Sequence, residues 1–318
     1  MNKRTALKML GATVALPMMG LHAARAASTT VRFSYQRSST LLTLLKANAT
    51  LEARLKPRGF DVSWHLFDNV VVPMNAGAVD FHADVADAVP IFTQSANAPL
   101  TFYAKEEASP SAEAIIVRAD SSVRTIADLK GKTVAVHRGS GCHFILVGAL
   151  KRAGLSFRDI TPAYLTPPDA AAAFERGSVD AWVIWDPFLA ITESKLPTRT
   201  LADATGFSSY DRYYTVNTAF VAAHPDIVGV VFDALVEQGT WVKQHPQDAV
   251  ARLAPLWGGL PAATIEVVNR RRSYVVRPVE KAGLGEQQAI ADTFFEAGLI
   301  PKAIDATAVP IWHPEAHT

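Results

Sequence analysis

Residues 133–154 read TVAVHRGSGCHFILVGALKRAG, and this stretch combines a strand, a turn of small residues and a helix. The apolar run Val134–Val136 predicts a buried strand, and the apolar spacing in residues 144–150 predicts one buried face of a helix. Gly139–Gly141 lie between them and let the backbone approach a neighbour closely. The first N–H groups of a helix have no partner within the helix, so such a turn can bind an anion. Most turns of this kind only connect a strand to a helix.

A second copy of this arrangement lies earlier in the chain. The sequence QRSS at 36–39 precedes HRGS at 137–140 by 101 positions, and GAVD at 77–80 precedes GSVD at 177–180 by 100 positions. Matching spacing at two separate places indicates an internal repeat. The repeat predicts two similar α/β lobes, each of which presents a strand–turn–helix end to a shared cleft.

The order of the predicted elements suggests how the two lobes divide the chain. Strands and helices alternate up to Thr218, which favours mostly parallel sheets flanked by helices, and the chain is mainly helical after Pro225. We expect a hinge of two strands, the second of them Thr218–Ala223, which returns to the first lobe. The predicted segments are residues 27–114 with 219–318 for the first lobe and 115–218 for the second.

Residues 1–26 have the features of an export signal. Basic residues precede the apolar run Met9–Leu21, and Ala24–Ala26 has the A-x-A form of a signal-peptidase site. No cysteine follows the apolar run as it does in a lipoprotein. We therefore expect an exported soluble protein, and an uncleaved N-terminal anchor is the alternative.

Composition excludes several classes of function. The chain has 318 residues, of which 49% are hydrophobic and 19% charged, as expected for a globular protein with a large core. Without residues 1–26 it keeps 27 basic and 30 acidic residues, a net charge of −3, which does not favour nucleic-acid binding. The only cysteine, Cys142, cannot form an internal disulfide, and no Cys/His pattern predicts zinc. We predict no cofactor, and export without disulfides suits a bacterial periplasm.

The repeated turns contribute the first candidate ligand-binding residues. These are Gln36 and Ser38 in the first copy and Ser140, Gly141, Cys142 and His143 in the second. The first helical turn is a place where the pKa of a thiol is lowered, but adjacent helix residues do not face each other. Cys142 and His143 therefore do not form a catalytic pair, and we expect Cys142 to line the turn. His143 either donates to a ligand oxygen or packs locally.

Further candidates follow the predicted strands at the cleft. Asp87, like Asp84, either faces a ligand cation or caps the next helix. Trp185 either covers an apolar ligand tail or belongs to the core, and Asp186 either orients a donor or caps a helix. The basic run Arg270–Arg272 is either a solvated surface or a contact that forms when the cleft closes.

Several of these motifs together resemble a known family. The chain resembles the periplasmic solute-binding proteins of sulfonate, nitrate and taurine ABC transporters, and most of all the aliphatic sulfonate-binding proteins. The motifs that carry the resemblance are Ser34–Arg37, Ala78–Asp80, Pro90–Phe92, Ala127–Lys132, Arg138–Ser140 with His143, Tyr164–Pro167, Asp180–Pro187 and Leu299–Lys302. They cover nearly the whole chain after residue 26.

The resemblance implies a type II periplasmic binding protein that closes on its ligand by a hinge motion and is not an enzyme. It implies a small-molecule sulfonate as ligand, an inner-membrane ABC permease as partner and no nucleic acid, and we expect a monomer. A sulfonate is a permanent anion with three acceptor oxygens. Two helix N-termini with Ser and Gln donors can bind it without a buried counter-charge, which would cost desolvation.

This chain departs from the family pattern at three places near the expected cleft. Ser38 stands where a glycine is common, and Gly141-Cys142 stand where serines are common. The segment Asp80–Phe92 is one residue longer than usual and has Ala88-Val89 where a proline is often found. These departures touch the cleft, so the preferred sulfonate can differ from the family norm. We expect an aliphatic sulfonate as ligand, and nitrate, taurine or an aromatic sulfonate is the alternative. A more distant alternative is an enzyme like the thiamine pyrimidine synthases, whose cysteine-rich motif this chain lacks.

Overall fold

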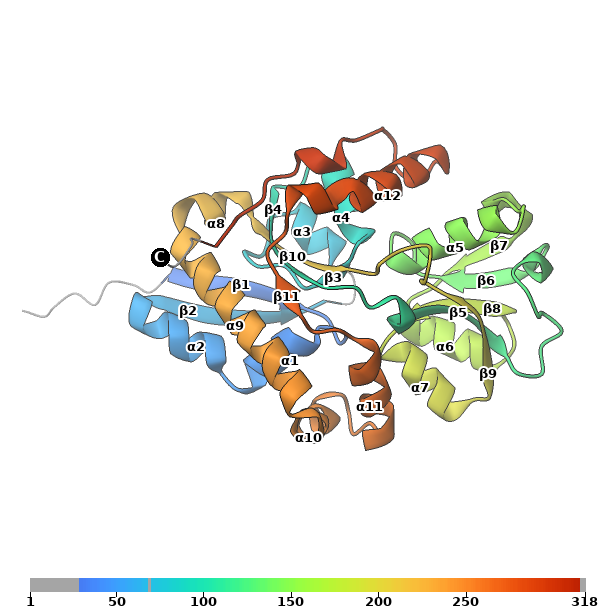
Figure 1. The fold of residues 1–318 in the computed structure, drawn as a ribbon, viewed down its shortest axis with the longest axis horizontal. Helices are drawn as coiled ribbons and strands as arrows, with labels where there is room; N and C mark the ends of the chain where they lie inside the picture. The colour runs from blue at the N-terminus through green and yellow to red at the C-terminus, as the bar shows by residue number, and fades with distance from the viewer. Residues whose placement is uncertain (1–28, 68–69, 315–318) are drawn as a thin grey trace, which may run out of the picture.

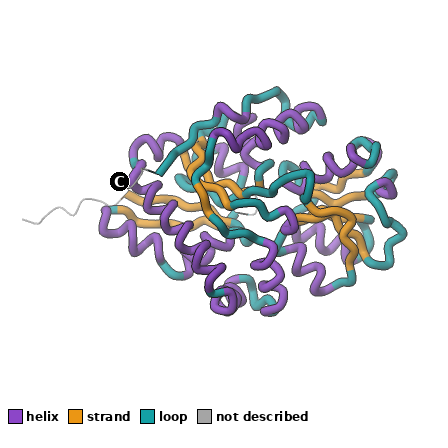
Figure 2. Tube along the Cα trace, in the orientation of Figure 1, coloured by secondary structure: helices purple, strands orange, loops and turns teal. Residues whose placement is uncertain are grey.

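The computed structural model describes residues 29–67 and 70–314, so the predicted export signal lies outside the described residues. The strands form two separate groups, and helices surround each group (Figures 1 and 2). This arrangement confirms the predicted α/β fold with two lobes. In the described part of the chain, no helix is both long and apolar enough to cross a membrane.

The sheet of the first lobe combines strands from both ends of the chain. Its strands are β1 (Thr29–Tyr35), β2 (Phe60–Leu66), β3 (Val85–Ala86), β4 (Leu100–Glu106), β10 (Arg212–Asn217) and β11 (Val276–Arg277). β1 and β2 are parallel, whereas β10 is antiparallel to both β3 and β4. Single bridges at Phe81 connect Phe33 of β1 with Val216 of β10, which joins the two parts into one layer.

The second lobe contains a five-stranded sheet in the order β7-β6-β8-β5-β9. Its strands are β5 (Glu113–Arg118), β6 (Thr133–Val136), β7 (Thr161–Tyr164), β8 (Ala181–Trp185) and β9 (Thr198–Asp203). β6 is parallel to β7 and β8, and β5 is antiparallel to β8 and β9. The chain enters the second lobe through β5 and returns to the first lobe through β10. Each of these strands is antiparallel to its neighbours in the sheet. The sheets therefore contain antiparallel pairs beside the expected parallel ones.

The second crossing between the lobes comes earlier than the sequence suggested. β10 pairs with β4, so residues 212–217 are part of the first sheet, although we expected the second lobe to extend to residue 218. The predicted strand Thr218–Ala223 is wrong, because these residues form helix α8. The Asn217 side chain caps this helix by accepting a hydrogen bond from the N–H of Ala219 at 2.9 Å. A short apolar run does not by itself distinguish a strand from a helix.

The helices cover both sheets. Those that follow or precede strands of the first lobe are α1 (Thr40–Ala47), α2 (Thr50–Leu55), α3 (Val71–Asn75), α4 (Val89–Ser95), α8 (Thr218–Ala223), α9 (Pro225–Gln244), α10 (Pro246–Leu256), α11 (Ala262–Arg271) and α12 (Gly285–Glu296). Those of the second lobe are α5 (Gly141–Arg152), α6 (Pro167–Glu175) and α7 (Phe188–Lys195). The C-terminal helices α9 and α10 pack on α1, as the sequence predicted for this part of the chain.

Hydrogen bonds confirm the internal repeat. The carboxylate of Asp80 accepts a hydrogen bond from the backbone N–H of Arg32, and that of Asp180 accepts one from Thr133, each at 2.8 Å. Arg32 lies in β1 and Thr133 begins the equivalent strand β6. Gly77 and Gly177 have φ values of 60° and 71°, a region that favours glycine. The Gly-x-Val-Asp motif therefore makes the same turn and the same contact in both lobes.

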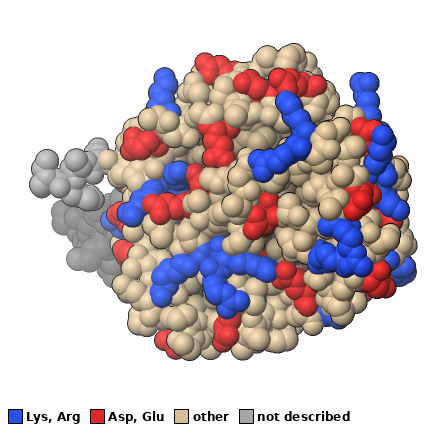
Figure 3. Space-filling model, turned by 45° about the vertical axis from the view of Figure 1, so that its right-hand side comes forward, with Lys and Arg blue, Asp and Glu red and all other residues tan. Residues whose placement is uncertain are grey.

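Apolar contacts also connect the two lobes. Phe294 of α12 lies 4.9 Å from Phe92 of α4 and 6.0 Å from Phe144 of α5, measured between ring centroids. In Figure 1, α12 extends from the first lobe toward α5, and α11 lies beside α7 on the other flank. Acidic and basic side chains are interspersed on the face shown in Figure 3, so this face has no extended patch of a single charge.

Candidate functional site

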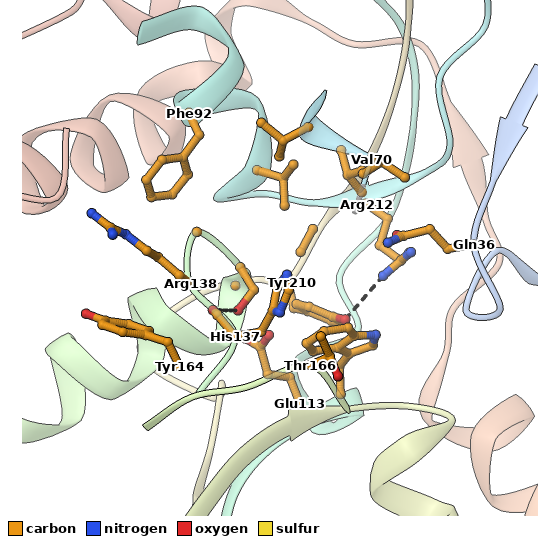
Figure 4. A pocket seen from close by; sticks show the side chains of 18 of the residues that line it. Gln36, Val70, Phe92, Glu113, His137, Arg138, Tyr164, Thr166, Tyr210 and Arg212 are labelled. Atoms are coloured by element: carbon orange, nitrogen blue, oxygen red, sulfur yellow. Dashed lines mark hydrogen bonds between the residues drawn. The ribbon is translucent and has the colours of Figure 1, made fainter. Parts of the chain in front are cut away.

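A cavity of about 440 Å³ lies between the lobes and receives residues from both (Figure 4). Its polar and charged lining residues are Gln36, Glu113, His137, Arg138, Ser140, Thr166, Tyr210 and Arg212. Its apolar and aromatic lining residues include Val70, Val71, Val89, Phe92, Tyr164, Leu165, Trp185 and Leu299. The cavity is therefore amphipathic and large enough for a small organic molecule.

The two repeated turns reach this cavity from opposite lobes. Gln36 follows β1, and residues 137–141 connect β6 to α5. Within each turn the serine that precedes the helix contacts the backbone three residues earlier, but in opposite directions: Ser39 Oγ accepts from the N–H of Gln36 at 3.1 Å, and Ser140 Oγ donates to the carbonyl of His137 at 2.7 Å. The second turn brings the start of α5 to the cavity, whereas in the first lobe only Gln36 lines it and the start of α1 is buried behind it.

The first turn of α5 offers backbone donors. Among the described residues, the N–H of Gly141 has no hydrogen-bond acceptor, and the N–H of Cys142 contacts its own thiol. The hydroxyl proton of Ser140 is already used in the bond to His137. The backbone N–H groups, rather than the serine hydroxyl, are therefore the donors at this helix start that an anion can use without rearrangement.

Four of the nine predicted ligand-binding residues line the cavity, namely Gln36, Ser140, Gly141 and Trp185. The other five, Ser38, Asp87, Cys142, His143 and Asp186, are buried beside it and are at most 3% exposed. In the first lobe, the Ser38 carbonyl accepts a hydrogen bond from Arg272 at 3.5 Å, and the Asp87 carboxylate accepts from the N–H of Ala88 at 2.7 Å and from the Ser208 hydroxyl. Burial raises the pKa of Asp87 to about 7.

Cys142 and His143 lack the electrostatics of a reactive pair. Burial, followed by the neighbouring Glu113 carboxyl group, raises the pKa of the Cys142 thiol well above its ordinary value, so the start of the helix does not activate this thiol. The helix N-terminus does not outweigh a fully buried site beside a carboxyl group. Burial lowers the pKa of His143 to about 4, and its Nδ1 accepts from the N–H of Gly139 at 3.4 Å. His143 is thus neutral and helps to shape the glycine turn.

Sequence reasoning missed Glu113, Arg138, Tyr210 and Arg212, which also line the cavity. Glu113 and Arg212 each begin a strand that follows a crossing between the lobes. Their position in the chain could have identified them. A strand that begins directly after the chain crosses between the lobes must begin beside the cleft. Arg138 belongs to the motif Arg138–Ser140 that carries the family resemblance. Its guanidinium lies over the Tyr164 ring, 5.6 Å from the ring centroid.

A buried ion pair forms part of the cavity wall. Arg212 Nε donates to Asp84 Oδ2 at 2.6 Å, its Nη2 donates to the Asp84 carbonyl at 2.9 Å, and its Nη1 donates to the Tyr210 hydroxyl at 3.2 Å. Both ionic side chains are at most 3% exposed. The resemblance implied a site without a buried counter-charge, whereas Arg212 lines this cavity with its charge balanced by Asp84. Asp84 thus neither caps a helix nor faces the cavity.

The basic run near the C-terminus connects parts of the fold rather than forming a solvated surface. Arg272 is 1% exposed and pairs with Glu106 at 2.6 Å inside the first lobe. Arg271 crosses to the second lobe, where its Nη1 lies 3.3 Å from Asp186 Oδ1 and its Nη2 lies 2.7 Å from Glu193 Oε2. Asp186 directly follows Trp185, so this contact between the lobes adjoins the cavity wall.

The described residues contain no group of three or more His, Cys, Asp or Glu side chains arranged to hold a metal ion. The cavity lining offers hydrogen-bond donors and an apolar surface, and the Cys142 thiol is fully buried beside it.

Comparisons with known proteins agree with this geometry. The family described as NMT1/THI5 like matches residues 68–249. A putative aliphatic sulfonates-binding protein of Escherichia coli is 34% identical and aligns over 92% of this chain and 91% of its own length. A protein of the same description from Bacillus subtilis is 29% identical over 88% and 85%. The alkanesulfonate-binding protein SsuA of Xanthomonas axonopodis, solved with MOPS bound, is 33% identical with a TM-score of 0.83 over 91% of this chain and 99% of that one.

Proposed function

Because this chain belongs to the NMT1/THI5-like family and, within it, to the aliphatic sulfonate-binding proteins, we propose that it captures an aliphatic sulfonate in the cavity between its lobes. It is the solute-binding component of an ABC importer and not an enzyme. The observation that carries the proposal is the cavity itself, where the start of α5, with the unpaired N–H of Gly141, borders an apolar surface.

The two parts of the cavity match the two parts of an alkanesulfonate. The head group carries a negative charge at all relevant pH values and has only acceptor oxygens, so it needs several donors. Gly141 and Cys142 at the start of α5 supply backbone N–H groups, and Gln36 lies on the opposite wall. The alkyl tail then lies against Trp185 and the other apolar lining residues, where burial of its surface is favourable.

The cellular role follows from this ligand and from the family. We infer that residues 1–26 direct export to the periplasm, that the monomeric protein closes on a sulfonate, and that an inner-membrane permease receives the closed form. Such uptake supplies sulfur. Nitrate, taurine and aromatic sulfonates remain alternative ligands for the same fold, and neither Asp87 nor Asp186 lines the cavity to receive the ammonium group of taurine.

Calorimetry of the purified protein tests the proposed ligand class. Ethanesulfonate, a longer alkanesulfonate, taurine, nitrate and sulfate are titrated in a buffer free of sulfonates. We expect saturable 1:1 binding of the alkanesulfonates, with tighter binding of the longer chain because it buries more apolar surface. Absence of binding to every sulfonate in the set would refute the proposed function.

The contact between Arg271 and the second lobe predicts an effect on closure. Arg271→Gln removes the ion pairs with Asp186 and Glu193, so we expect a roughly two- to tenfold weaker affinity for the alkanesulfonate, because the open state gains population. Small-angle scattering should also show a larger radius of gyration for the free variant. Arg270→Gln, a change at the exposed neighbouring residue, is the matched control. Equal affinities of both variants and wild type would show that Arg271 does not contribute to closure.

A further inference from the structure

Glu113 is a fully buried carboxyl group in the cavity wall. It begins β5 and pairs across the sheet with Trp185, so both residues border the cavity from neighbouring strands. Its exposed fraction is 0%. By hydrogen-bond geometry, neither of its carboxyl oxygens has a partner among the described residues. A buried polar group without a partner is costly and usually has a functional reason.

The Glu113 carboxyl lies at the start of helix α5. A Cβ atom at Gly141, the first residue of α5, would be only 2.6 Å from Glu113 Oε2. An anion bound by the N–H groups of this helix start therefore lies beside Glu113. If Glu113 were ionised, two negative charges would share one buried space, which is strongly unfavourable.

The surroundings of Glu113 favour its neutral form. Burial, followed by the charge of Asp87, raises the pKa of Glu113 well above its ordinary value, while the Cys142 thiol and Arg212 lower it by less. Arg212 is engaged with Asp84, and the Tyr210 hydroxyl accepts a hydrogen bond from Arg212. No cation is therefore left to pair with an ionised Glu113 among the groups that face it, and the Cys142 thiol is only a weak hydrogen-bond donor.

We propose that Glu113 is held as the neutral carboxylic acid and that its O–H donates a hydrogen bond to a sulfonate oxygen of the bound ligand. This inference rests on the proposed function and assigns a specificity-determining residue to it. A neutral acid adds a donor at the helix start without adding a charge. It favours a head group that only accepts hydrogen bonds, and it offers no carboxylate to an ammonium group.

The proposal predicts that ligand binding is linked to protonation of Glu113. A permanent anion binds the protonated form better, so binding raises the pKa of Glu113 and takes up a proton where the free protein is partly ionised. Affinity for ethanesulfonate should then fall as the pH rises through the Glu113 pKa, by up to about tenfold per pH unit. Affinity should level off at lower pH, where Glu113 is fully protonated.

Calorimetry with ethanesulfonate between about pH 5 and about pH 9, in two sulfonate-free buffers with different ionisation enthalpies, measures this linkage. Wild type should take up a proton on binding at the higher pH values. Glu113→Gln keeps a donor but cannot ionise, so it should retain affinity within about threefold of the low-pH value and lose most of the pH dependence. Asp87, whose pKa is about 7, titrates in both proteins and interacts with Glu113, so the comparison is repeated in an Asp87→Asn background to isolate Glu113. Glu237→Gln, at an exposed site, is the control.

The possible outcomes separate this inference from the proposed function. Identical pH dependence in wild type and Glu113→Gln would overturn the inference while leaving sulfonate binding intact. Proton release on binding, or a Glu113→Gln variant that loses taurine but not ethanesulfonate, would also overturn it, because Glu113 would then be a carboxylate that receives a ligand cation. If no protein in the series binds a sulfonate, the proposed function itself fails.

Discussion

Arg212→Met is expected to lower the free energy of unfolding by about 3–5 kcal/mol. The substitution removes the guanidinium that donates to the Asp84 carboxylate and carbonyl and to the Tyr210 hydroxyl. Asp84 is 0% exposed and would be left in the interior with only the more distant Arg272, at 3.8 Å. Most of the expected loss comes from this unpaired charge and not from the lost attraction alone. Urea unfolding followed by circular dichroism measures it.

A surface ion pair provides the matched control for this change. Arg277 pairs with Glu107 at 3.0 Å, but these side chains are 60% and 46% exposed. Arg277→Met should therefore cost at most about 1 kcal/mol, because water screens the pair and solvates the remaining carboxylate. The double variant Arg212→Met with Asp84→Asn should recover part of the lost stability. Equal stability of Arg212→Met and wild type would contradict the role given to the buried pair.

Gly141→Val is expected to weaken sulfonate binding by roughly 10- to 100-fold, which corresponds to about 1.4–2.7 kcal/mol. The new Cβ would meet Glu113 Oε2 at 2.6 Å and Ala86 Cβ of the first lobe at 3.1 Å. The larger side chain therefore forces the lobes apart at the helix start that faces the ligand. Calorimetric titration gives the affinity, and scattering of the ligand-bound variant should show incomplete closure.

Gly285→Val is the control for this variant, because Gly285 is also the first residue of a helix. A Cβ at Gly285 would have no atom within 4 Å, and the residue has an ordinary helical φ of −60°. This change should leave sulfonate affinity unaltered. If Gly141→Val bound the ligand as tightly as wild type, the start of α5 would not be part of the binding site.

The sequence predicted the two lobes and the two turns because a repeat leaves its trace in local patterns. The strand–turn–helix units at residues 29–47 and 133–152 are each continuous in the chain, so apolar spacing and small residues reveal them. Gln36, Ser140 and Gly141 were found for this reason, since each lies in such a unit, and Trp185 was found because it ends the strand β8 that follows the repeated Gly-x-Val-Asp motif. Where these residues stand relative to a ligand stays a prediction.

The missed parts of the cavity depend on contacts between distant segments. Arg212 lines the cavity only because β10 pairs with β3 and β4, and its partner Asp84 lies 128 positions away. Glu113 reaches the cavity only because β5 enters the second sheet beside β8. Local periodicity contains no information on such pairings. For the same reason it did not show that Arg271 and Arg272, which are adjacent in the chain, contact different lobes.

A crystal structure of the protein with ethanesulfonate tests the central claim most directly. The account predicts density for the ligand in the cavity between the lobes, with sulfonate oxygens about 3 Å from the backbone nitrogen of Gly141 or Cys142 and the ethyl group toward Trp185. A sulfonate bound with its head group away from the start of α5, or outside this cavity, would contradict the account.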